Sequence, residues 1–259
     1  MSVDALTQES RNGPKIGVLV PFTNVNLEPD MQLLCPPGCT MHFERMGGYD
    51  ADAIPGADQM AGLGSSDLSQ STRLIAGVRP SAVLYGCTSA TLTHGVQFDE
   101  QLAQDIATHT KGGVDPTVCI TAASALVQSI IALGVSKVGF SSPYLGEIND
   151  KAVAFMAASG IETVARADIG RELDNYGQGE LTPEQVHDLA MKVNKPDVEA
   201  IVLSCTDMRS VEAIDQIEKD TGKPVVTSNQ AMVYQLCLRL NLPADYLIGG
   251  KLLTSLKNS

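Results

Sequence analysis

The sequence predicts an α/β fold of two pseudo-symmetric lobes, each a parallel four-stranded sheet flanked by helices, with a cleft between the lobes. Apolar runs of about five residues alternate with helical stretches of about a dozen, which is typical of parallel sheets covered by helices on both faces. Three strand-to-loop segments also recur in the same order in the second half of the chain. Ordered recurrence of this kind indicates a duplicated α/β unit.

The recurring segments lie at corresponding points of the two halves. KIGVLVPFTN, which begins at Lys15, resembles KVGFSSPY, which begins at Lys137. LYGCTS contains Cys87 and resembles VLSCTD, which contains Cys205. PTVCITAASALV resembles PVVTSNQAMV farther along the chain. Each segment ends an apolar run, so each is expected to carry a strand into a loop.

Eight strands and eight helices follow from the apolar periodicity and the positions of turn residues. Strands are predicted at residues 16–21, 41–45, 82–86, 118–121, 137–141, 162–165, 200–204 and 224–227. Helices are predicted at residues 28–34, 67–78, 98–108, 122–133, 144–159, 183–193, 208–221 and 231–240. Gly134 and Gly160 follow two of these helices, where a left-handed cap is expected.

The predicted strands divide between the two lobes. The first three strands and the fifth to seventh are expected to build the two sheets, while the fourth and eighth open helices that link or close the lobes. The predicted domains are therefore residues 1–116 with 224–259 for the first lobe and residues 117–223 for the second.

Composition indicates an ordinary globular protein and excludes several other classes. The 259 residues are 44% hydrophobic and 19% charged, which is enough apolar material for two lobes with a substantial core. The formal net charge of −12, with 18 basic residues spread along the chain, argues against nucleic-acid binding. No apolar run reaches the length of about 18 residues that a membrane span needs. The N-terminal segment lacks the pattern of a signal peptide, so a cytoplasmic location is expected.

The six cysteines are expected to be free thiols in a reducing compartment. Cys35 and Cys39 lack a second Cys or His pair at zinc-like spacing, so they are interpreted as loop residues. Cys119 and Cys237 lie within apolar runs and are interpreted as core residues.

Cys87 and Cys205 differ from the other cysteines because each stands where a buried strand gives way to a polar turn. The carboxyl ends of parallel strands are where α/β proteins bind ligands. The two thiols are therefore predicted to face one small substrate from opposite lobes.

Loops after the other predicted strands supply further candidates. Asn24 and Asn26 follow the first strand and either hydrogen-bond a ligand or cap the next helix. Tyr144 follows the fifth strand and could point its hydroxyl into the cleft. The segment DNYG, which contains Asn175, is polar enough to be a plain turn. His94 lies about two helical turns after Cys87 and could line the same cleft, although a partly exposed helix position is favoured.

Together these segments resemble a known family. VPFTNVNLEPD at residues 20–30 resembles the Val-Pro-Ser-Ser-Asn-Thr-Thr-x-Glu-Pro-Glu segment of the maleate cis-trans isomerases. Those enzymes belong to the aspartate/glutamate racemase superfamily, which also contains arylmalonate decarboxylase and the ectoine-utilisation protein EutA. The Gly-Cys-Thr-Ser, Ser-Cys-Thr, Pro-Tyr and Asp-Asn segments extend the resemblance over nearly the whole chain.

The resemblance implies a role for eight residues and an Asp/Glu racemase-like fold with the active site between the lobes. Cys87 and Cys205 would be the catalytic pair. Asn24, Tyr144 and Asn175 match positions that hold substrate carboxylates in the isomerases. Backbone amides at Thr88, Ser89 and Thr206 would donate to a carboxylate, as N–H groups at a helix start can.

The implied reaction needs no cofactor and no metal. Cys87, as a thiolate, would add to one carbon of a cis-enedioate and leave a single bond that can rotate. Cys205 would handle the proton at the neighbouring carbon. Helix N-termini lower the pKa of a thiol, so both loops are expected to favour the thiolate.

Other reactions stay open at this point. An amino-acid or hydantoin racemase would use the same two thiols on opposite faces of one carbon, although racemases of the superfamily usually have a Gly-rich turn where this chain has Pro21 and Phe22. The decarboxylase keeps only the second cysteine, whereas both are present here. A lyase reaction or ligand binding without catalysis are further alternatives.

Departures from the isomerase pattern bear on the substrate and partners. Phe22, Val25 and Asn26 replace small polar residues next to the expected carboxylate site, which favours a small carboxylate that is larger or singly charged. The resemblance implies a homodimer or homotetramer. No nucleic-acid or membrane partner is expected.

Overall fold

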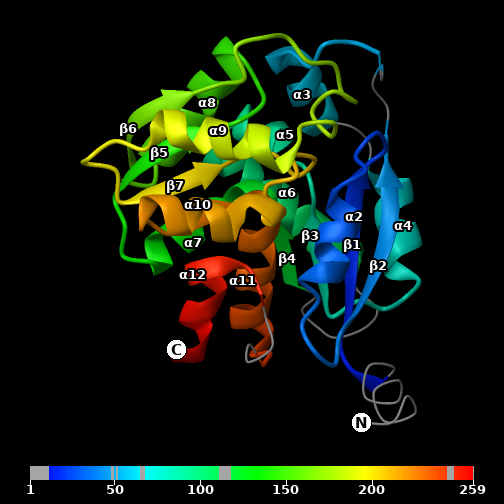
Figure 1. Ribbon diagram of the computed structural model, residues 1–259. Helices are drawn as coiled ribbons and strands as arrows, with labels where there is room; N and C mark the ends of the chain where they lie inside the picture. Colours follow the sequence, from blue (N-terminus) through cyan, green and yellow to red (C-terminus); the bar gives the residue numbers. More distant parts are fainter. Residues whose placement is uncertain are drawn as a thin grey trace.

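The computed structural model describes residues 12–47, 50, 52–64, 68–110, 118–243 and 248–258. Its strands form two separate four-stranded sheets (Figure 1). The first contains, in spatial order, β2 (Thr40–Met46), β1 (Lys15–Pro21), β3 (Ala82–Tyr85) and β4 (Val118–Thr121). The second contains β6 (Glu162–Ala167), β5 (Lys137–Ser141), β7 (Ala200–Leu203) and β8 (Val225–Thr227). The shared order and the parallel pairing throughout confirm the predicted fold class.

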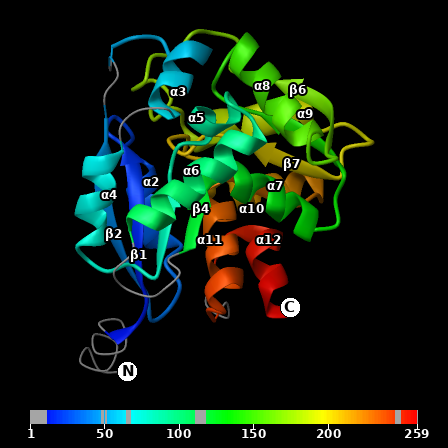
Figure 2. The ribbon, with the colours of Figure 1, turned by 180° about the vertical axis from the view of Figure 1, so that it is seen from behind.

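Helices cover both faces of each sheet (Figures 1 and 2). In the first half of the chain they are α2 (Leu27–Leu33), α3 (Ala57–Gly64), α4 (Ser69–Ala76), α5 (Thr88–Leu92), α6 (Val96–His109) and α7 (Ala122–Ala132). In the second half they are α8 (Gly146–Ala157), α9 (Pro183–Val193), α10 (Ile214–Thr221), α11 (Ser228–Leu240) and α12 (Gly250–Ser255). Short 3-10 helices occupy η1 (Val211–Ala213) and η2 (Leu256–Asn258). Among the described segments, no helix is both long and apolar enough to cross a membrane.

The fourth strand of each sheet requires a correction. β4 pairs with β3, and β8 pairs with β7, so these strands complete the sheets instead of only opening linking helices. The predicted boundaries at residues 117 and 224 placed residues 118–121 in the second lobe and residues 224–227 in the first. The hydrogen-bonded register reverses both placements, while the division into two domains remains a prediction.

Three helices are not predicted from the sequence, because they are short or contain glycine, which lowers helix propensity. α3 is rich in Ala and Gly, α5 has only five residues, and α12 has six. The predicted helix at 208–221 begins later, as η1 followed by α10. The predicted helix at 144–159 begins at Gly146, which leaves Tyr144 in the preceding loop.

α7 and α11 join the lobes. Each begins directly after the fourth strand of a sheet, and the last residue of that strand caps it: Thr121 accepts from the amide of Ser124 at 3.1 Å, and Thr227 accepts from the amide of Gln230 at 3.2 Å. The two helices pack against each other (Figures 1 and 2). The first ten residues of α11 are buried.

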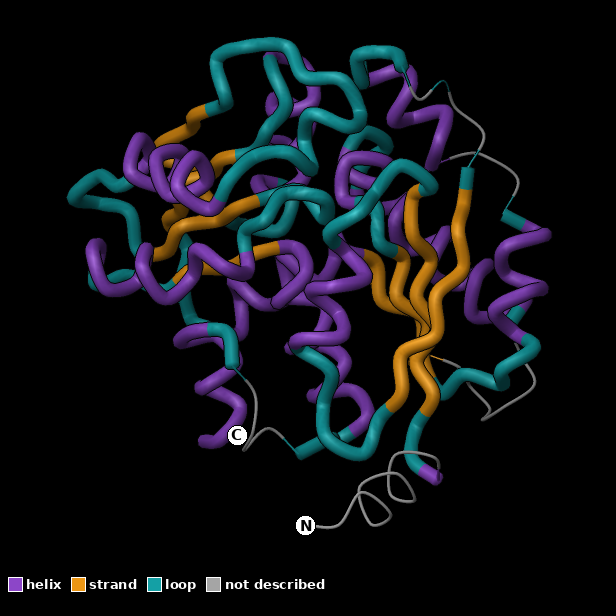
Figure 3. Tube along the Cα trace, turned by 45° about the vertical axis from the view of Figure 1, so that its right-hand side comes forward, coloured by secondary structure: helices purple, strands orange, loops and turns teal. Residues whose placement is uncertain are grey.

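A single apolar core cluster includes residues of both lobes, among them Val18 from β1, Ile130 from α7 and Val202 from β7. The tube in Figure 3 shows the two sheets beside each other with their strands in different directions. In Figure 1 the β7 arrow points towards the first lobe. The continuous core therefore fixes the carboxyl ends of the central strands relative to each other.

Alanine substitutions at equivalent glycines of the two sheets are expected to lower the free energy of unfolding by different amounts. A Cβ on Gly139 in β5 would lie 2.6 Å from the backbone oxygen of Val193, whereas one on Gly17 in β1 would meet a side-chain carbon of Ile75 at 2.6 Å. A side chain shifts more easily than backbone, so we expect Gly139→Ala to lower the free energy of unfolding by about 1–3 kcal/mol and Gly17→Ala by less. Urea denaturation of both variants measures the difference. Equal losses would contradict this explanation.

Candidate functional site

The two cysteine loops meet between the lobes. Cys87 follows β3 and precedes α5, and Cys205 follows β7, so both thiols stand at the carboxyl ends of central strands. The hydroxyl of Thr206 donates to the carbonyl oxygen of Gly86 at 2.8 Å, which ties one loop to the other. Both cysteines are buried. The prediction that they come together from opposite lobes agrees with this geometry.

Two hydroxyl groups lie between the thiols. The Ser89 oxygen is 3.8 Å from the sulfur of Cys87 and 3.2 Å from the Tyr144 hydroxyl. The Tyr144 hydroxyl is in turn 3.7 Å from the sulfur of Cys205. A chain of polar atoms thus runs from one sulfur to the other.

A cavity of about 30 Å³ borders these groups. Its lining consists of Pro21, Thr23, Asn24, Met60, Leu63, Cys87, Tyr144, Asn175, Gln178, Cys205, Thr206 and Asp207. This volume holds about one water molecule. Any organic substrate therefore requires the lining to move outward, and we call this arrangement with a small cavity closed.

Six of the eight predicted site residues line this cavity, and the other two lie just behind it. The side chain of Ser89 reaches Tyr144, as described above. The Thr88 hydroxyl donates away from the cavity to the Ser228 hydroxyl at 2.9 Å. Only the backbone amide of Thr88 thus remains for the role that the sequence predicts.

Asn24 does two things at once. Its side-chain oxygen accepts from the amides of Asn26 at 3.1 Å and Leu27 at 2.9 Å, so it caps α2. Its side-chain nitrogen donates to Thr206 at 3.0 Å across the lobe boundary. The two readings of Asn24, as a cap and as a cleft residue, are thus compatible.

Tyr144 is held by a buried polar pair. The Asn149 side chain donates to the Tyr144 carbonyl at 2.6 Å, and the Ser142 hydroxyl accepts from the Tyr144 amide at 3.1 Å. Ser142 also donates to the oxygen of Asn149 at 2.6 Å. These bonds fix the backbone from which the Tyr144 ring reaches the thiols.

α3 covers the cavity and was not anticipated. It contributes Met60 and Leu63, and the Ser89 hydroxyl contacts the sulfur of Met60 at 3.1 Å. Asn175, from the second lobe, donates to the carbonyl of Ala53 at 2.9 Å and that of Asp50 at 3.3 Å. In this closed state the Asn175 amide thus holds the segment that leads into α3, and its binding of a substrate carboxylate stays a prediction.

His94 contacts α3, the helix that covers the cavity, and does not line the cavity itself. One ring nitrogen lies 2.7 Å from the carbonyl of Ala61 in α3, and the ring stacks on Phe98 with the ring centres 4.0 Å apart. The favoured expectation of an exposed position for His94 thus agrees with the structure, and the alternative that it lines the cleft is wrong.

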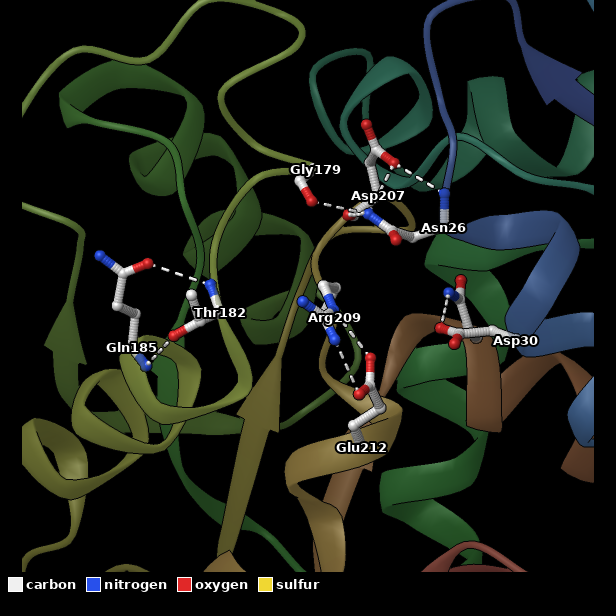
Figure 4. Close-up of polar contacts among 9 residues, drawn as sticks. Asn26, Asp30, Gly179, Thr182, Gln185, Asp207, Arg209 and Glu212 are labelled. Atoms are coloured by element: carbon white, nitrogen blue, oxygen red, sulfur yellow. Dashed lines mark hydrogen bonds and ion pairs between the residues drawn. The ribbon is translucent and has the colours of Figure 1, made fainter.

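Asp207 and Asn26 form a second link between the lobes (Figure 4). One Asp207 carboxylate oxygen accepts from the amides of Val25 at 2.9 Å and Asn26 at 3.0 Å. The Asn26 side chain donates to the Asp207 carbonyl at 2.6 Å and to that of Gly179 at 3.0 Å. The sequence predicts Asn26 only as a ligand or cap and predicts no contact for Asp207. The position of Asp207, two residues after Cys205, was the sequence signal for this link.

Burial dominates the electrostatics of both thiols, contrary to the expected lowering of their pKa. Burial raises the pKa of Cys87, against the opposing effect of the amides of Ala90 and Ser89. Burial, helped by the charge of Asp207, raises the pKa of Cys205 to about 12. The loop amides act in the predicted direction but are outweighed while the cavity is closed.

The remaining cysteines lie apart from the cavity. The Cys35 thiol is 3.6 Å from the carbonyl of Cys39 within their loop. Cys237 is buried on α11, and Cys119 is half-buried on β4 and packs against the core.

A family model described as arylmalonate decarboxylase matches residues 59–253, about three quarters of the chain. The chain belongs to the arylmalonate decarboxylase family. A curated relative in this branch, the arylmalonate decarboxylase of Bordetella bronchiseptica, is 25% identical over 236 residues, with 84% of each chain covered.

This family member is also similar to maleate isomerases along most of its length. It is 27% identical over 244 residues to the maleate isomerase of Nocardia farcinica, covering 92% of this chain and 95% of that one. The solved structure of the Nocardia farcinica maleate cis-trans isomerase bound to TRIS has a TM-score of 0.85 and 26% identity, covering 95% of this chain and all of the other. A cysteine-to-serine variant of that isomerase, solved with a covalently bound succinylcysteine intermediate, has a TM-score of 0.83 and 26% identity, covering 93% and 98% of the two chains. The predicted branch of the superfamily is confirmed.

Behind the Cys205 loop, a buried acid pairs with a buried amide. The Asn229 side chain donates to Asp30 at 2.7 Å and to the carbonyl of Thr206 at 3.0 Å. Burial raises the pKa of Asp30 to about 7; the charges of Glu212 and Asp207 add to this, while the hydrogen bond from Asn229 and the charge of Arg209 oppose it. The Asn229 oxygen has no hydrogen-bond partner among the described residues.

We expect Asp30→Asn to stabilise the protein at pH 8 by about 1–3 kcal/mol, since an amide there avoids a buried charge and offers a donor. Between about pH 4 and pH 7 folded Asp30 keeps a proton that the unfolded chain releases, so its contribution to the free energy of unfolding falls as pH rises. Urea denaturation at pH 5 and pH 8 should show a smaller fall in the variant. An identical pH dependence in the two proteins would refute this assignment.

Proposed function

We propose that this protein is a cofactor-independent isomerase that converts a small maleate-type acid from cis to trans with Cys87 and Cys205. The observation that carries the proposal is the pair of buried thiols at equivalent strand ends, separated by two hydroxyls and bordering one cavity. The maleate isomerases to which the chain is similar support the substrate class.

Cys87 is assigned as the nucleophile. Burial is the main cause that raises its pKa, so an opening of the cavity to admit substrate removes much of that penalty. The amides of Ser89 and Ala90 and the Ser89 hydroxyl then stabilise the thiolate. No charged side chain is among the causes that act on Cys87.

Cys205 is assigned as the proton donor and acceptor. The charge of Asp207 adds to burial in raising its pKa, and this favours the protonated thiol. The amide of Asp207 lies 3.4 Å from the Cys205 sulfur and can stabilise the thiolate that remains after proton transfer.

The reaction balances without an external reagent. The Cys87 thiolate forms a carbon–sulfur bond to one alkene carbon, and the π electrons move to the neighbouring carbon, which takes the proton of Cys205. The carbon–carbon single bond rotates. Cys205 then removes a proton from the same carbon, the double bond re-forms, and the carbon–sulfur bond breaks to return the Cys87 thiolate. A succinyl group is saturated, so the succinylcysteine of the Nocardia farcinica isomerase variant supports an adduct of this kind.

The remaining predicted residues are assigned to substrate binding. Asn24 is assigned through its side chain and Thr206 through its backbone amide, and Tyr144 presents its hydroxyl beside both thiols. The amides of Thr88 and Ser89 are assigned to one carboxylate at the Cys87 end. Asn175 is assigned to a carboxylate once α3 moves and frees its donors.

We also propose that the protein forms a homodimer or homotetramer and, separately, that it is located in the cytoplasm. Light scattering of the purified protein tests the first, and fractionation of the source cells tests the second.

We expect Cys87→Ser and Cys205→Ser each to lower kcat by about 100-fold or more, because each removes a group that makes or breaks a bond in every turnover. Cys205→Ser should also accumulate an adduct on Cys87 that mass spectrometry detects as the protein plus one substrate. Cys35→Ala, at a thiol outside the cavity, is the matched control and should keep full activity.

NMR in deuterated water separates the alternatives. Production of fumarate from maleate supports the isomerase, deuterium at the α-carbon of aspartate or glutamate indicates a racemase, and loss of carbon dioxide from an arylmalonate indicates a decarboxylase. Turnover of maleate that survives in both serine variants would sink the two-thiol mechanism.

A further inference from the structure

An acidic side chain stands in the cavity wall beside Cys205. Asp207 lines the cavity, is only 5% exposed, and places its amide 3.4 Å from the Cys205 sulfur. The group of a substrate that lies next to Cys205 therefore lies near this carboxyl group.

The surroundings of Asp207 hold it in the ionised form at neutral pH. One oxygen, Oδ1, accepts from the backbone amides of Val25 and Asn26 and, at 3.3 Å, from the Asn26 side chain. Donors aimed at a carboxylate stabilise its charge. Burial raises the pKa of Asp207 to about 6, which still leaves it mainly ionised at pH 7.

The other oxygen, Oδ2, accepts no hydrogen bond from the described part of the chain. Gly179 packs closely against it, since a Cβ on that glycine would come within 2.9 Å of Oδ2. The carboxylate thus has a hydrogen-bond acceptor to spare on a residue that borders the cavity.

Within the described lining of the cavity, no positively charged side chain balances the negative charge of Asp207. The described residues that line the cavity include neither Lys nor Arg. Arg45, which lowers the pKa of Asp207 from outside the cavity, forms an ion pair with Glu28 at 2.5 Å and donates to the carbonyl of Asn24. A second substrate carboxylate at this end would face a like charge with only neutral donors to balance it.

We propose that Asp207 makes the site selective for a cis-enedioate monoamide over the dicarboxylate, with the neutral amide group beside Cys205 donating to Oδ2. This inference rests on the proposed isomerase function and names its substrate class. The single carboxylate lies at the Cys87 end, where the Thr88 and Ser89 amides are assigned to it. Asp207 is thus a specificity-determining residue, and it discriminates by repelling one terminal group and accepting a hydrogen bond from the other.

The Asp207→Asn variant tests the effect of the charge apart from the hydrogen bonds that link residue 207 to the first lobe. An asparagine has the same size and retains an oxygen that can accept from Val25 and Asn26, but it removes the charge and turns an NH₂ group towards the second position. Asp207→Ala removes both the charge and the link to the first lobe. Asp188→Asn, on an exposed side chain of α9, is the matched control for loss of one negative charge.

Turnover of maleate and of its monoamide is compared in all four proteins. We expect the unsubstituted protein to favour the monoamide in kcat/KM by roughly tenfold or more, and Asp207→Asn to abolish or reverse that preference mainly through KM. Asp207→Ala should slow both substrates, and Asp188→Asn should leave the ratio unchanged. If maleate is the better substrate of the unsubstituted protein, or if Asp207→Asn keeps its preference, the inference is overturned while the isomerase function stands.

Binding of saturated analogues tests the same selectivity without any reaction. Calorimetry with succinamate and succinate should show tighter binding of succinamate by the unsubstituted protein, and Asp207→Asn should lose that difference. This result together with no isomerisation of either alkene would refute the proposed function and retain the selectivity. Equal or tighter binding of succinate by the unsubstituted protein would overturn the selectivity itself.

Discussion

The hydrogen bond from Thr206 to the carbonyl of Gly86 is the contact on which the candidate site depends. It joins the two strand-end loops that carry the thiols, and the shared apolar core behind it keeps the two sheets from moving independently. The links through Asn24 and through Asp207 with Asn26 join the same Cys205 loop to the loop between β1 and α2. The thiols face one cavity because neither loop can shift without breaking several buried polar contacts.

Burial and ionisation oppose each other at this site. A dry cavity excludes water and strengthens every polar contact inside it, but it also disfavours the thiolate that the proposed chemistry needs. The raised pKa of Cys87 in the closed state expresses this conflict. Because substrate must open the cavity to enter, ionisation of Cys87 and admission of substrate belong to the same step.

Much of the fold could be predicted because each strand of the duplicated unit has its own apolar run, and the cysteine pair stood out because it repeats. The sequence could not predict which sheet β4 and β8 join, because a three- or four-residue strand shows no preference for one sheet over the other. α3 was not predicted because two of its eight residues are glycine, so Met60 and Leu63 gave no signal as cavity residues. The pKa of the thiols was misjudged because a sequence shows the helix that follows Cys87 but not how completely the loop is buried.

Asn175 belongs to one lobe and holds the segment that leads to the cover over the other. The cover cannot lift without releasing these bonds, so the exposure of the thiols to solvent is coupled to a contact between the lobes. Such an arrangement keeps the Cys87 thiol away from oxidants between turnovers.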